Sequence, residues 1–379
     1  MGKRRRKGKW GGRSCFVTGY PSLVTRRLVY ELLARERECT VTALVREKFV
    51  AEAKTYISKY LSPDMQKRLS VVTGDIVNMH LGLSSDEYTL LIENTTDVYH
   101  LATISYRGVD EKTMRLVNVY GTRNMLEFAD DCRNLSRFNY FSTCFVSGDR
   151  VGVIREEELD SGQRFRNAFE RTKYEAELLV RHHSNKTPIS IYRPSIVIGD
   201  SRTGEIDRFS EPYYIAIAMI GSPIRTPLPL VGDGSAPLNI VPADYVVRAM
   251  HKLSQIPETV GKTFHLADSN PLSVRQVYEI IALKMGKKLP LYHIPRRIAK
   301  LAFRLPGLEK YFPSPLRAID YIDHLAIYST TNTMKFLMGT GIICPSFEEY
   351  VDNLIGFVQN YYEEKRHKRA EDGLTDQLA

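Results

Sequence analysis

Phe169 lies four residues before Lys173 in the segment FERTK. A phenol beside an ammonium group can pass a proton to a reacting oxygen, and a positioned general acid contributes on the order of 10²–10⁴ in rate. Phe169 carries no hydroxyl, so this pair lacks its proton donor. Tyr174 lies five positions from Phe169 on a predicted helix and points away from it. Thr143, Tyr140 or a water molecule are the candidate substitutes.

A second chemical feature is the segment TGYPSLVT, which starts at residue 18 and leads from a predicted strand into a predicted helix. It has the spacing of a Gly-x-x-Gly-x-x-Gly dinucleotide loop but keeps only the first glycine, Gly19. The first glycine makes the turn, the second lets the backbone approach a pyrophosphate, and the third packs helix on strand. Ser22 and Thr25 replace the other two, which predicts weakened binding. A strand–turn–helix without any ligand is the alternative.

Arg46 follows the second predicted strand, 27 residues after Gly19. At this strand end an acidic residue suits the ribose of NAD, whereas an arginine suits the 2′-phosphate of NADP. The sequence therefore predicts NADP(H) in preference to NAD(H). The alternative is a solvated surface arginine.

These residues need a scaffold, and short apolar runs that alternate with helical patterns supply it. Strands are predicted at 14–18, 40–45, 69–72, 97–101, 138–142 and 189–192, and helices at 23–35, 113–129 and 165–182. This alternation is typical of βαβ units, so we expect an α/β fold with a Rossmann-type doubly wound parallel sheet. After about residue 200, proline- and glycine-rich segments predict a smaller C-terminal substrate-side region.

The predicted domains are a basic flexible tail (1–13), a dinucleotide-binding Rossmann domain (14–200), a substrate-side region of short helices and strands (201–362) and a charged flexible tail (363–379). The 379 residues are 43% hydrophobic, which supports a packed core. The first thirteen residues supply seven of the nine net positive charges, so the folded body is close to neutral.

Composition excludes several classes of protein. The five cysteines are scattered without a C-x-x-C pair, which argues against a disulfide framework or a structural zinc site, and no other metal site is expected. No apolar segment follows the basic N-terminus or reaches the length of a membrane span. We therefore expect a cytoplasmic protein.

Further landmarks lie on or directly after the predicted strands and in one predicted helix, in a particular order along the chain. They are TGDI at 73–76, HLA at 100–102, NVYGT at 118–122, FST at 141–143, YRPSIVIG at 192–199 and NIVPADYV at 239–246. Their content and order resemble the extended short-chain dehydrogenase/reductase superfamily. With GDSRTGE at 199–205, the chain is similar to the thioester-reductase and fatty-acyl-CoA-reductase ("male sterility") branch, over about residues 14 to 360.

The resemblance implies a cofactor groove whose parts follow the dinucleotide from the pyrophosphate, through the 2′-phosphate and the adenine, to the ribose and nicotinamide. Gly19, Ser22 and Thr25 match the residues at the pyrophosphate, and Arg46 matches the residue at the 2′-phosphate. Asp75 and Ile76 match those at the adenine, and Leu101 and Ala102 match those at the ribose and nicotinamide. The remaining matches to the cofactor-binding set are Asn118, Pro194, Ile196 and Lys173.

The resemblance also implies catalytic roles. Thr143 matches the serine or threonine that hydrogen-bonds a substrate carbonyl, and Lys173 matches the lysine that holds the nicotinamide ribose and lowers the pKa of the catalytic phenol. Phe169 stands at the position of that phenol. Together with the altered glycine loop, this departure favours weakened or lost activity.

Two basic segments bear on partners. At 294–305, isoleucines and leucines share one helical face flanked by basic residues, which suits either peripheral contact with an anionic membrane or a core-facing helix with a solvated back. The basic N-terminus suits phospholipid head groups, and no nucleic-acid-binding motif accompanies it, so nucleic acid is not an expected partner. The oligomeric state stays open.

Three functions stay open. The first is an NADPH-dependent reductase of an acyl or other lipid-like carbonyl with slow or atypical catalysis. The second is a catalytically silent dinucleotide-binding sensor or scaffold, which Phe169 favours. The third is a protein-interaction module without cofactor, which the altered glycine loop favours and the retained Arg46, Asp75 and Lys173 oppose.

Overall fold

The computed structural model describes residues 12–105, 109–207, 230–289, 293–295, 298 and 324–375. Its centre is a seven-stranded sheet with only parallel pairings and the order β11-β7-β5-β4-β1-β2-β3. The strands are β1 (Ser14–Thr18), β2 (Thr40–Val45), β3 (Leu69–Thr73), β4 (Asp97–His100), β5 (Arg137–Phe141), β7 (Ile189–Pro194) and β11 (Thr263–Leu266). The chain winds outward in one direction from β1 to β3 and in the other from β4 to β11, which confirms the predicted doubly wound sheet.

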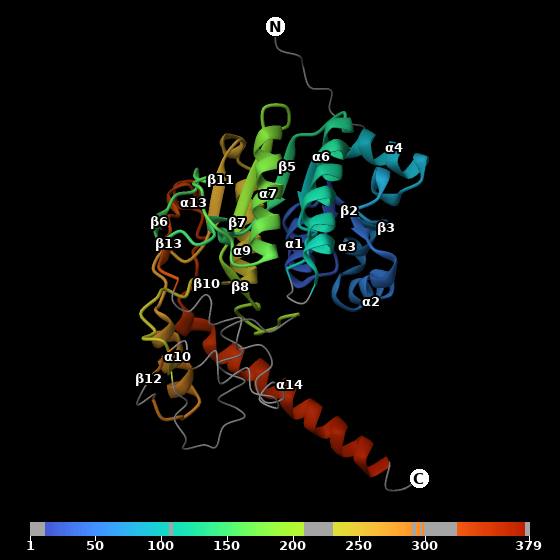
Figure 1. Cartoon of the computed structure of the whole chain (residues 1–379). Coiled ribbons are helices and arrows are strands. Elements are labelled where there is room, and N and C mark those ends of the chain that lie inside the picture. The colour runs from blue at the N-terminus through green and yellow to red at the C-terminus, as the bar shows by residue number, and fades with distance from the viewer. Residues whose placement is uncertain are drawn as a thin grey trace.

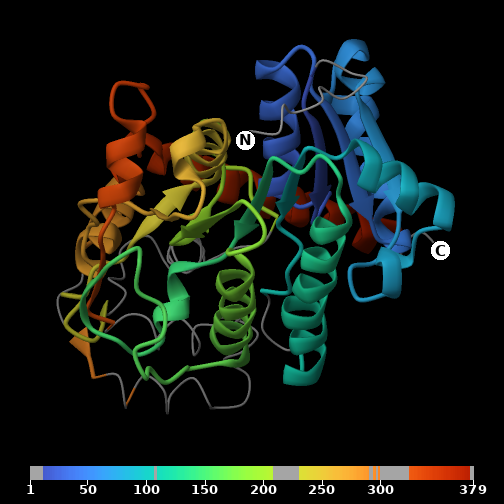
Figure 2. The same cartoon turned by 90° about the horizontal axis from the view of Figure 1, so that it is seen from above.

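Helices cover both faces of this sheet (Figures 1 and 2). On one face lie α1 (Leu23–Arg35) and α9 (Ala243–Ser254), and on the other α6 (Gly121–Asp131) and α7 (Ala168–His183) lie side by side. Apolar residues recur every three or four positions in these helices and pack in two clusters, one against each face. The sheet is therefore buried on both sides, as its continuous apolar strands require.

Several boundaries differ from the predicted ones for local reasons. The predicted helix at 113–129 is three segments, namely α5 (Glu111–Arg115), a π turn at Leu116–Tyr120, and α6. The helix predicted at 165–182 begins only at Ala168, because the side chain of Asn167 caps it by accepting the N–H of Glu170 at 3.0 Å. The strands predicted at 14–18 and 40–45 have those bounds in the structure.

A second, smaller core lies below the sheet in Figure 1 and joins α10, α14, β8 and β10. The remaining elements are α2 (Val50–Tyr60), α3 (Pro63–Lys67), α4 (Ser85–Asn94), β6 (Gly152–Ile154), β8 (Ile196–Ile198), β9 (Leu230–Val231), β10 (Ile240–Pro242), α10 (Val274–Lys284), β12 (His293–Ile294), β13 (Ala326–Tyr328), α13 (Thr331–Leu337) and α14 (Phe347–Thr375). The edge strand β11 and the covering helix α9 both come from beyond residue 200. The sheet layer therefore contains residues from both of the domains predicted to meet at residue 200. Residues 363–375, predicted as a flexible tail, continue α14.

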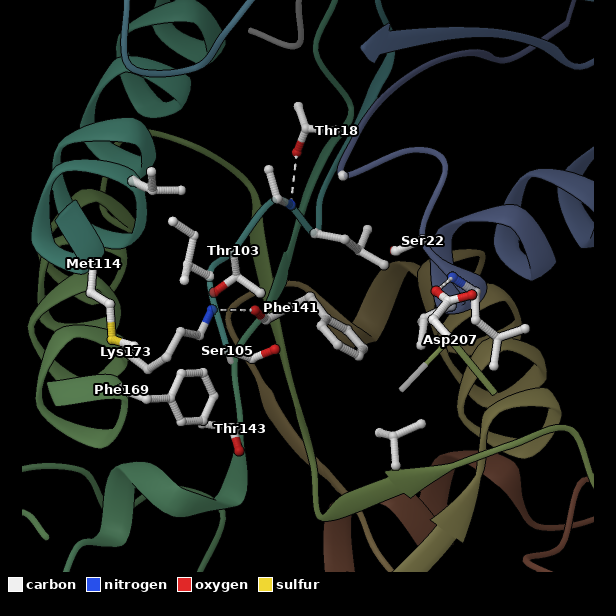
Figure 3. Close-up of a pocket in the computed structure, with 18 of the residues that line it drawn as sticks. Thr18, Ser22, Thr103, Ser105, Met114, Phe141, Thr143, Phe169, Lys173 and Asp207 are labelled. Atoms are coloured by element: carbon white, nitrogen blue, oxygen red, sulfur yellow. Dashed lines mark hydrogen bonds between the residues drawn. The ribbon is translucent and has the colours of Figure 1, made fainter. Parts of the chain in front are cut away.

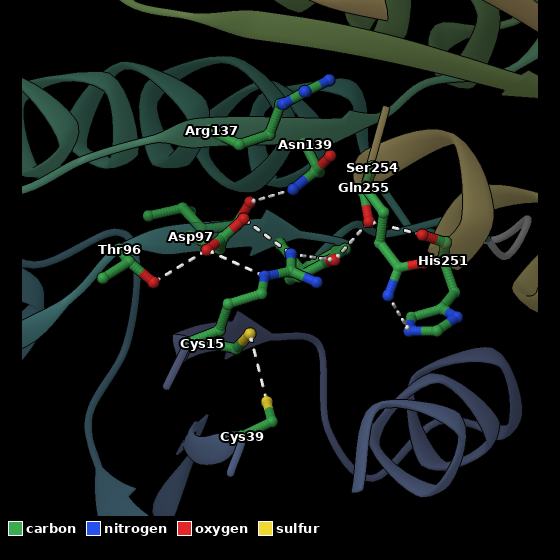
Figure 4. Close-up of polar contacts among 12 residues, drawn as sticks. Cys15, Cys39, Thr96, Asp97, Arg137, Asn139, His251, Ser254 and Gln255 are labelled. Atoms are coloured by element: carbon green, nitrogen blue, oxygen red, sulfur yellow. Dashed lines mark hydrogen bonds and ion pairs between the residues drawn. The ribbon is translucent and has the colours of Figure 1, made fainter. Parts of the chain in front are cut away.

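The sequence predicts Arg13 as part of the basic tail, but its side chain belongs to the folded body. Arg13 Nη2 lies 2.6 Å from Asp97 Oδ1, and Arg13 Nη1 lies 2.8 Å from Glu36 Oε1. Figure 4 shows Asp97 in this network beside Cys15 and Cys39, whose Sγ atoms are 3.6 Å apart as free thiols. Arg13 is held because Asp97 is buried and needs a cationic partner.

Two predictions concern other parts of the chain. Most of the basic helix predicted at 294–305, and residues 1–11 of the basic tail, lie outside the described residues. Across the part of the chain that the structure describes, no helix has both the length and the apolar composition to cross a bilayer. Within the same residues, no three His, Cys, Asp or Glu side chains gather as metal ligands.

Candidate functional site

A cavity of about 1190 Å³ lies at the carboxyl ends of the sheet strands (Figure 3). Residues at the ends of β1, β2, β3, β4, β5 and β7 line it, as is typical of ligand sites in doubly wound sheets. It brings together twelve residues with a predicted role, namely Gly19, Ser22, Arg46, Asp75, Ile76, Leu101, Ala102, Thr143, Phe169, Lys173, Pro194 and Ile196. The other two, Thr25 and Asn118, do not line the cavity.

Gly19 forms the turn after β1 with φ of +95°, a backbone conformation that favours glycine. A Cβ atom at this position would lie 2.9 Å from the backbone nitrogen of Ala102 and 2.9 Å from the carbonyl carbon of Leu101. The first loop glycine is therefore required by its φ angle and by the close approach of two backbone segments.

The two hydroxyls that replace the other loop glycines bond to each other. The Thr25 hydroxyl donates to the Gly19 carbonyl at 2.9 Å, so the Ser22 hydroxyl, 2.6 Å from Thr25 Oγ1, donates to Thr25. Thr25 is fully buried and does not reach the cavity, because its hydroxyl faces back into the loop. Ser22 and Thr25 are thus accommodated inside the turn, and only Ser22 lines the cavity.

The first turn of α1 binds a carboxylate that the sequence does not predict. The backbone N–H of Leu23 donates to Asp207 Oδ2 at 2.5 Å, and Arg26 Nη2 lies 2.9 Å from Asp207 Oδ1. Arg26 and Arg27 directly follow the glycine loop, and two cations near a helix N-terminus, where the dipole disfavours positive charge, indicate that an acidic partner lies close to them. Asp207 lies 184 residues further along the chain and carries no such signal.

Arg46 and Asp75, which the resemblance places at the 2′-phosphate and the adenine, form an ion pair with each other. Arg46 Nε lies 2.9 Å from Asp75 Oδ2, and Asp75 Oδ1 accepts the N–H of Val77 at 3.2 Å. The Arg46 side chain is 47% exposed, so its guanidinium is accessible from solvent. The pair fixes the turn after β3 and keeps a cation at the cavity wall.

A buried chain of hydrogen bonds positions the backbone after β4. Thr122 donates to the carbonyl of Asn118 at 2.7 Å, so His100 Nε2 donates to Thr122 Oγ1 at 3.0 Å. His100 Nδ1 then accepts from Thr18 Oγ1 at 2.8 Å, and Thr18 accepts the N–H of Ala102 at 3.2 Å. Burial, and then a nearby lysine ammonium, lower the pKa of His100 to about 3, which keeps the ring neutral as this chain requires.

Asn118, in the π turn, is a positioning residue and not part of the cavity wall. Its Oδ1 accepts from the N–H of Ile104 at 2.8 Å and from the hydroxyl of Thr103 at 2.9 Å. Its Nδ2 donates to the Ile104 carbonyl at 3.1 Å and to Thr172 Oγ1 at 3.0 Å. The side chain therefore fastens the cavity-lining segment after β4 to α7, and the amide has no hydrogen left for a cofactor.

Lys173, Phe169 and Thr143 lie together on one wall of the cavity, with the Phe169 ring beside the other two side chains (Figure 3). The Lys173 ammonium donates to the Phe141 carbonyl at 2.7 Å and lies 4.6 Å from the centre of the Tyr140 ring. Burial lowers the pKa of Lys173 to about 7. The structure therefore brings together the three residues at the expected catalytic positions, and one of the three is a phenyl ring.

The Thr143 hydroxyl is held loosely at the end of β5. It accepts the N–H of Phe145 at 3.3 Å, and its contact with the Pro194 carbonyl is 3.5 Å, which is long for a hydrogen bond between oxygens. Its hydrogen can therefore turn toward a carbonyl oxygen in the cavity.

Neither neighbouring phenol takes the place of Phe169. Tyr140 is fully buried, does not line the cavity, and has its pKa raised by burial. Tyr174 is also absent from the lining, and burial and a hydrogen bond with Asp160 raise its pKa to about 12. Among the described residues that line the cavity, the one tyrosine is Tyr20, in the glycine loop.

A buried ionic cluster stands behind Thr143. The Glu177 carboxylate lies 2.6 Å from Arg193 Nη2 and 3.0 Å from Arg181 Nε, and it accepts the Ser142 hydroxyl at 2.6 Å. The side chains of Glu177 and Arg193 are 0% and 1% exposed. Burial alone would raise the pKa of Glu177, but the charge and hydrogen bonds of Arg193 hold it at about 2. The cluster fixes Ser142, and with it the backbone that carries Thr143.

Comparison with known proteins agrees with this architecture. An NAD-binding family model described as "Male sterility protein" matches residues 17–250. Fatty acyl-CoA reductase wat of Drosophila melanogaster is 25% identical over 274 residues, which cover 62% of this chain and 52% of that protein. A linear gramicidin synthase of Brevibacillus parabrevis is 23% identical over 349 residues, which cover 88% of this chain and 7% of that protein. The chain thus spans about half, or far less, of the length of these relatives.

Solved structures agree in the same way. The terminal R domain from the myxalamid PKS-NRPS biosynthetic pathway has a TM-score of 0.78 and 27% identity, covering 91% of this chain and 92% of that one. A thiolation-reductase di-domain from an archaeal non-ribosomal peptide synthetase has the same fold, with a TM-score of 0.73 at 18% identity, covering 93% of this chain and 76% of that one. With more than half of its length matched by the family model, the chain belongs to the male sterility protein family, in the thioester-reductase branch of the extended short-chain dehydrogenases/reductases.

Proposed function

We propose that this protein binds NADP(H) in the cavity and acts as a reductase of an acyl or other lipid-like carbonyl, with proton transfer weakened at Phe169. The observation that carries the proposal is the cavity wall on which Lys173 and Thr143 lie beside Phe169. The relatives support the substrate class, because one is named a fatty acyl-CoA reductase and another, from Aspergillus flavus, an aldehyde reductase.

The described residues fit a dinucleotide. Gly19 makes the tight turn that leads from β1 into α1, which is the role of the first glycine in a dinucleotide loop. The Leu23 N–H at the start of α1 already binds a carboxylate oxygen, which resembles a phosphate oxygen in charge and in hydrogen bonding. When bound, the nicotinamide ring supplies the hydride of the reduction.

The chain's own side chains would orient the carbonyl and supply only part of the proton chemistry. Reduction adds a hydride to the carbonyl carbon and a proton to its oxygen. The Thr143 hydroxyl is available to donate a hydrogen bond to that oxygen, and Lys173 has a pKa of about 7 and so carries a proton on part of the molecules at neutral pH. Phe169 cannot donate, which removes a contribution on the order of 10²–10⁴ in rate.

Arg46 supports the choice of NADP(H). Its ion pair with Asp75 runs through Nε, so a 2′-phosphate would be met by the terminal nitrogens of the same guanidinium. A bidentate contact of that kind is available to NADP(H) and not to NAD(H), whose ribose carries a hydroxyl at this position.

A second function is a catalytically silent sensor or scaffold that binds the dinucleotide without turnover. The observation that favours it is the absence of a phenol beside Lys173 among the described cavity-lining residues. Both proposed functions use the same cofactor-binding cavity. They differ in whether a substrate carbonyl is reduced there.

Restoring the missing hydroxyl separates the two. Phe169→Tyr should create or raise NADPH-dependent reduction of a medium-chain aldehyde or an acyl-CoA thioester by about tenfold or more, because the new phenol would lie beside Lys173. The measurement is NADPH oxidation under single-turnover and steady-state conditions. The matched control is the double variant Phe169→Tyr with Lys173→Met, which adds the phenol but removes the ammonium that lowers its pKa.

Each outcome decides between the functions. A gain in Phe169→Tyr that the double variant loses supports a reductase site weakened at one atom. Ordinary turnover by the wild type, unchanged in Phe169→Tyr, would show that another group supplies the proton. NADPH binding without turnover in either protein supports the sensor or scaffold, and no binding by calorimetry refutes both functions.

A further inference from the structure

The N-terminus of α1 is occupied by an acid from a distant part of the chain. Ser22, the N-cap residue, makes no side-chain capping bond, and the N–H of Leu23 donates instead to Asp207 Oδ2 at 2.5 Å. Asp207 lines the same cavity as the glycine loop, and Figure 3 shows it beside Ser22 at the end of α1. A carboxylate thus lies where this fold binds the pyrophosphate of a dinucleotide.

The contact belongs to a segment at 200–207, here called the acidic strap, that meets two arginines of α1. Arg26 Nη2 lies 2.9 Å from Asp207 Oδ1 and 3.1 Å from Glu205 Oε1. Arg27 Nη2 lies 3.1 Å from Glu205 Oε2 and 3.4 Å from Asp200 Oδ2. Three carboxylates and two guanidiniums therefore hold the acidic strap across the first turn of α1.

The base of the acidic strap is fixed to neighbouring helices. Gly204 has φ of +68°, and a Cβ atom there would lie 2.2 Å from the carbonyl oxygen of Asn353 in α14. Asn353 Nδ2 donates to the Ser201 carbonyl at 2.8 Å, and the N–H of Ser201 donates to Asp244 Oδ1 of α9 at 2.8 Å. Asp207, at the far end, is directed to the α1 N-terminus by an anchored base.

We infer that the acidic strap is a built-in competitor of the dinucleotide, with the Asp207 carboxylate occupying the pyrophosphate position until the cofactor displaces it. This inference rests on the proposed function for the identity of the ligand. One backbone N–H cannot donate fully to two anions, and a pyrophosphate beside Asp207 would be repelled by like charge. Cofactor binding therefore requires the Asp207 carboxylate to leave the Leu23 N–H. The observed dissociation constant of the cofactor is then the intrinsic one divided by the fraction of molecules in which the acidic strap is open.

Plain helix capping is the alternative explanation of the same contact. An acid near a helix N-terminus stabilises the helix through its dipole and orphan N–H groups, whether or not a ligand ever binds there. The two explanations differ in one consequence. If Asp207 only caps α1, then removing its charge lowers stability and leaves dinucleotide affinity unchanged; if it competes, then affinity rises.

The test measures NADPH binding to the full chain by calorimetry. A hydrogen bond to a charged group changes an equilibrium constant by roughly tenfold or more, and the low end of this range applies because the Asp207 side chain is 38% exposed to water. Asp207→Asn should therefore bind NADPH about tenfold more tightly than wild type. Asp207→Ala, which removes the acceptor, should bind at least as tightly. The matched control is Glu31→Gln, because Glu31 pairs with Arg35 on the same helix but lies outside the acidic strap, and its loss should change affinity about twofold or less.

Inorganic pyrophosphate serves as a second probe that does not depend on the proposed function. Tighter pyrophosphate binding to Asp207→Asn than to wild type supports competition even if neither protein binds NADPH, in which case the proposed function alone fails. Equal or weaker binding of both probes by Asp207→Asn and Asp207→Ala overturns the inference and, where NADPH still binds, leaves the proposed function intact. Thermal unfolding without ligand establishes that each variant is folded.

Discussion

Glu177→Gln tests whether the buried ionic cluster behind Thr143 is held by charge. The substitution keeps the shape of the side chain but leaves the guanidinium of Arg193, which is 1% exposed, without its carboxylate partner. Breaking a buried pair by removing one partner costs about 3–5 kcal/mol, because the remaining charge stays in a medium of low dielectric constant. We expect the free energy of unfolding to fall by that amount at pH 7, measured by urea denaturation.

The pH dependence of the unfolding free energy tests the same ion pair, because the folded and unfolded states bind protons differently at Glu177. The pKa of Glu177 is about 2 in the folded protein and near its ordinary value of 4.5 in the unfolded chain. The unfolded state therefore binds more protons between these values, so the stabilisation is complete above about pH 4.5 and is lost as the pH falls toward 2. The difference in unfolding free energy between wild type and Glu177→Gln should shrink across that window.

A matched control uses an exposed pair that joins α5 to α7, the helix that carries Glu177. Glu111 pairs with Arg171 of α7 at 3.0 Å, and their side chains are 49% and 48% exposed. Because water screens this pair, Glu111→Gln should cost less than about 1 kcal/mol. Equal losses for Glu177→Gln and Glu111→Gln would refute the argument, since Arg193 would then have found water or another partner.

Two further predictions concern the glycine loop and the choice of cofactor. Gly19→Ala should lower the free energy of unfolding more than Gly152→Ala does, because both positions have a positive φ but only a Cβ at position 19 would lie 2.9 Å from Ala102. Urea unfolding compares the two variants, and equal losses would show that the backbone contact relaxes. Arg46→Gln should weaken NADPH binding by about tenfold and leave NADH binding within about twofold, as measured by calorimetry, and an equal loss for both would exclude a 2′-phosphate contact.

Local patterns were sufficient to predict the strands and helices around the glycine loop. β1, α1 and β2 have the predicted bounds, because each is a short apolar run or a helical pattern between clear turns. The π turn at Leu116–Tyr120 was missed because the apolar spacing passes through it without interruption. β11 was missed because it is only four residues long and lies beyond residue 200, where no sheet strand was expected. Its pairing with β7 makes it part of the sheet.

The candidate site shows the same division between local and distant information. Twelve of fourteen predicted residues line one cavity, because parallel strands bring their carboxyl ends together. Side-chain direction was harder to predict. The Thr25 hydroxyl faces into its own loop, and the Asn118 side chain makes its hydrogen bonds to the segment after β4 and to α7. Asp207 was missed entirely, because its contact with Leu23 arises only once the chain has folded.

The position of the acidic strap along the chain has a consequence in time. Six of the seven sheet strands precede residue 195, whereas Asp207 follows Leu23 by 184 residues. The last of these six strands ends at Pro194, and Asp207 follows it by 13 residues. At a synthesis rate of ~5–20 residues per second, the strand ends that line the cavity are therefore complete about 1–3 seconds before the competing carboxylate is made.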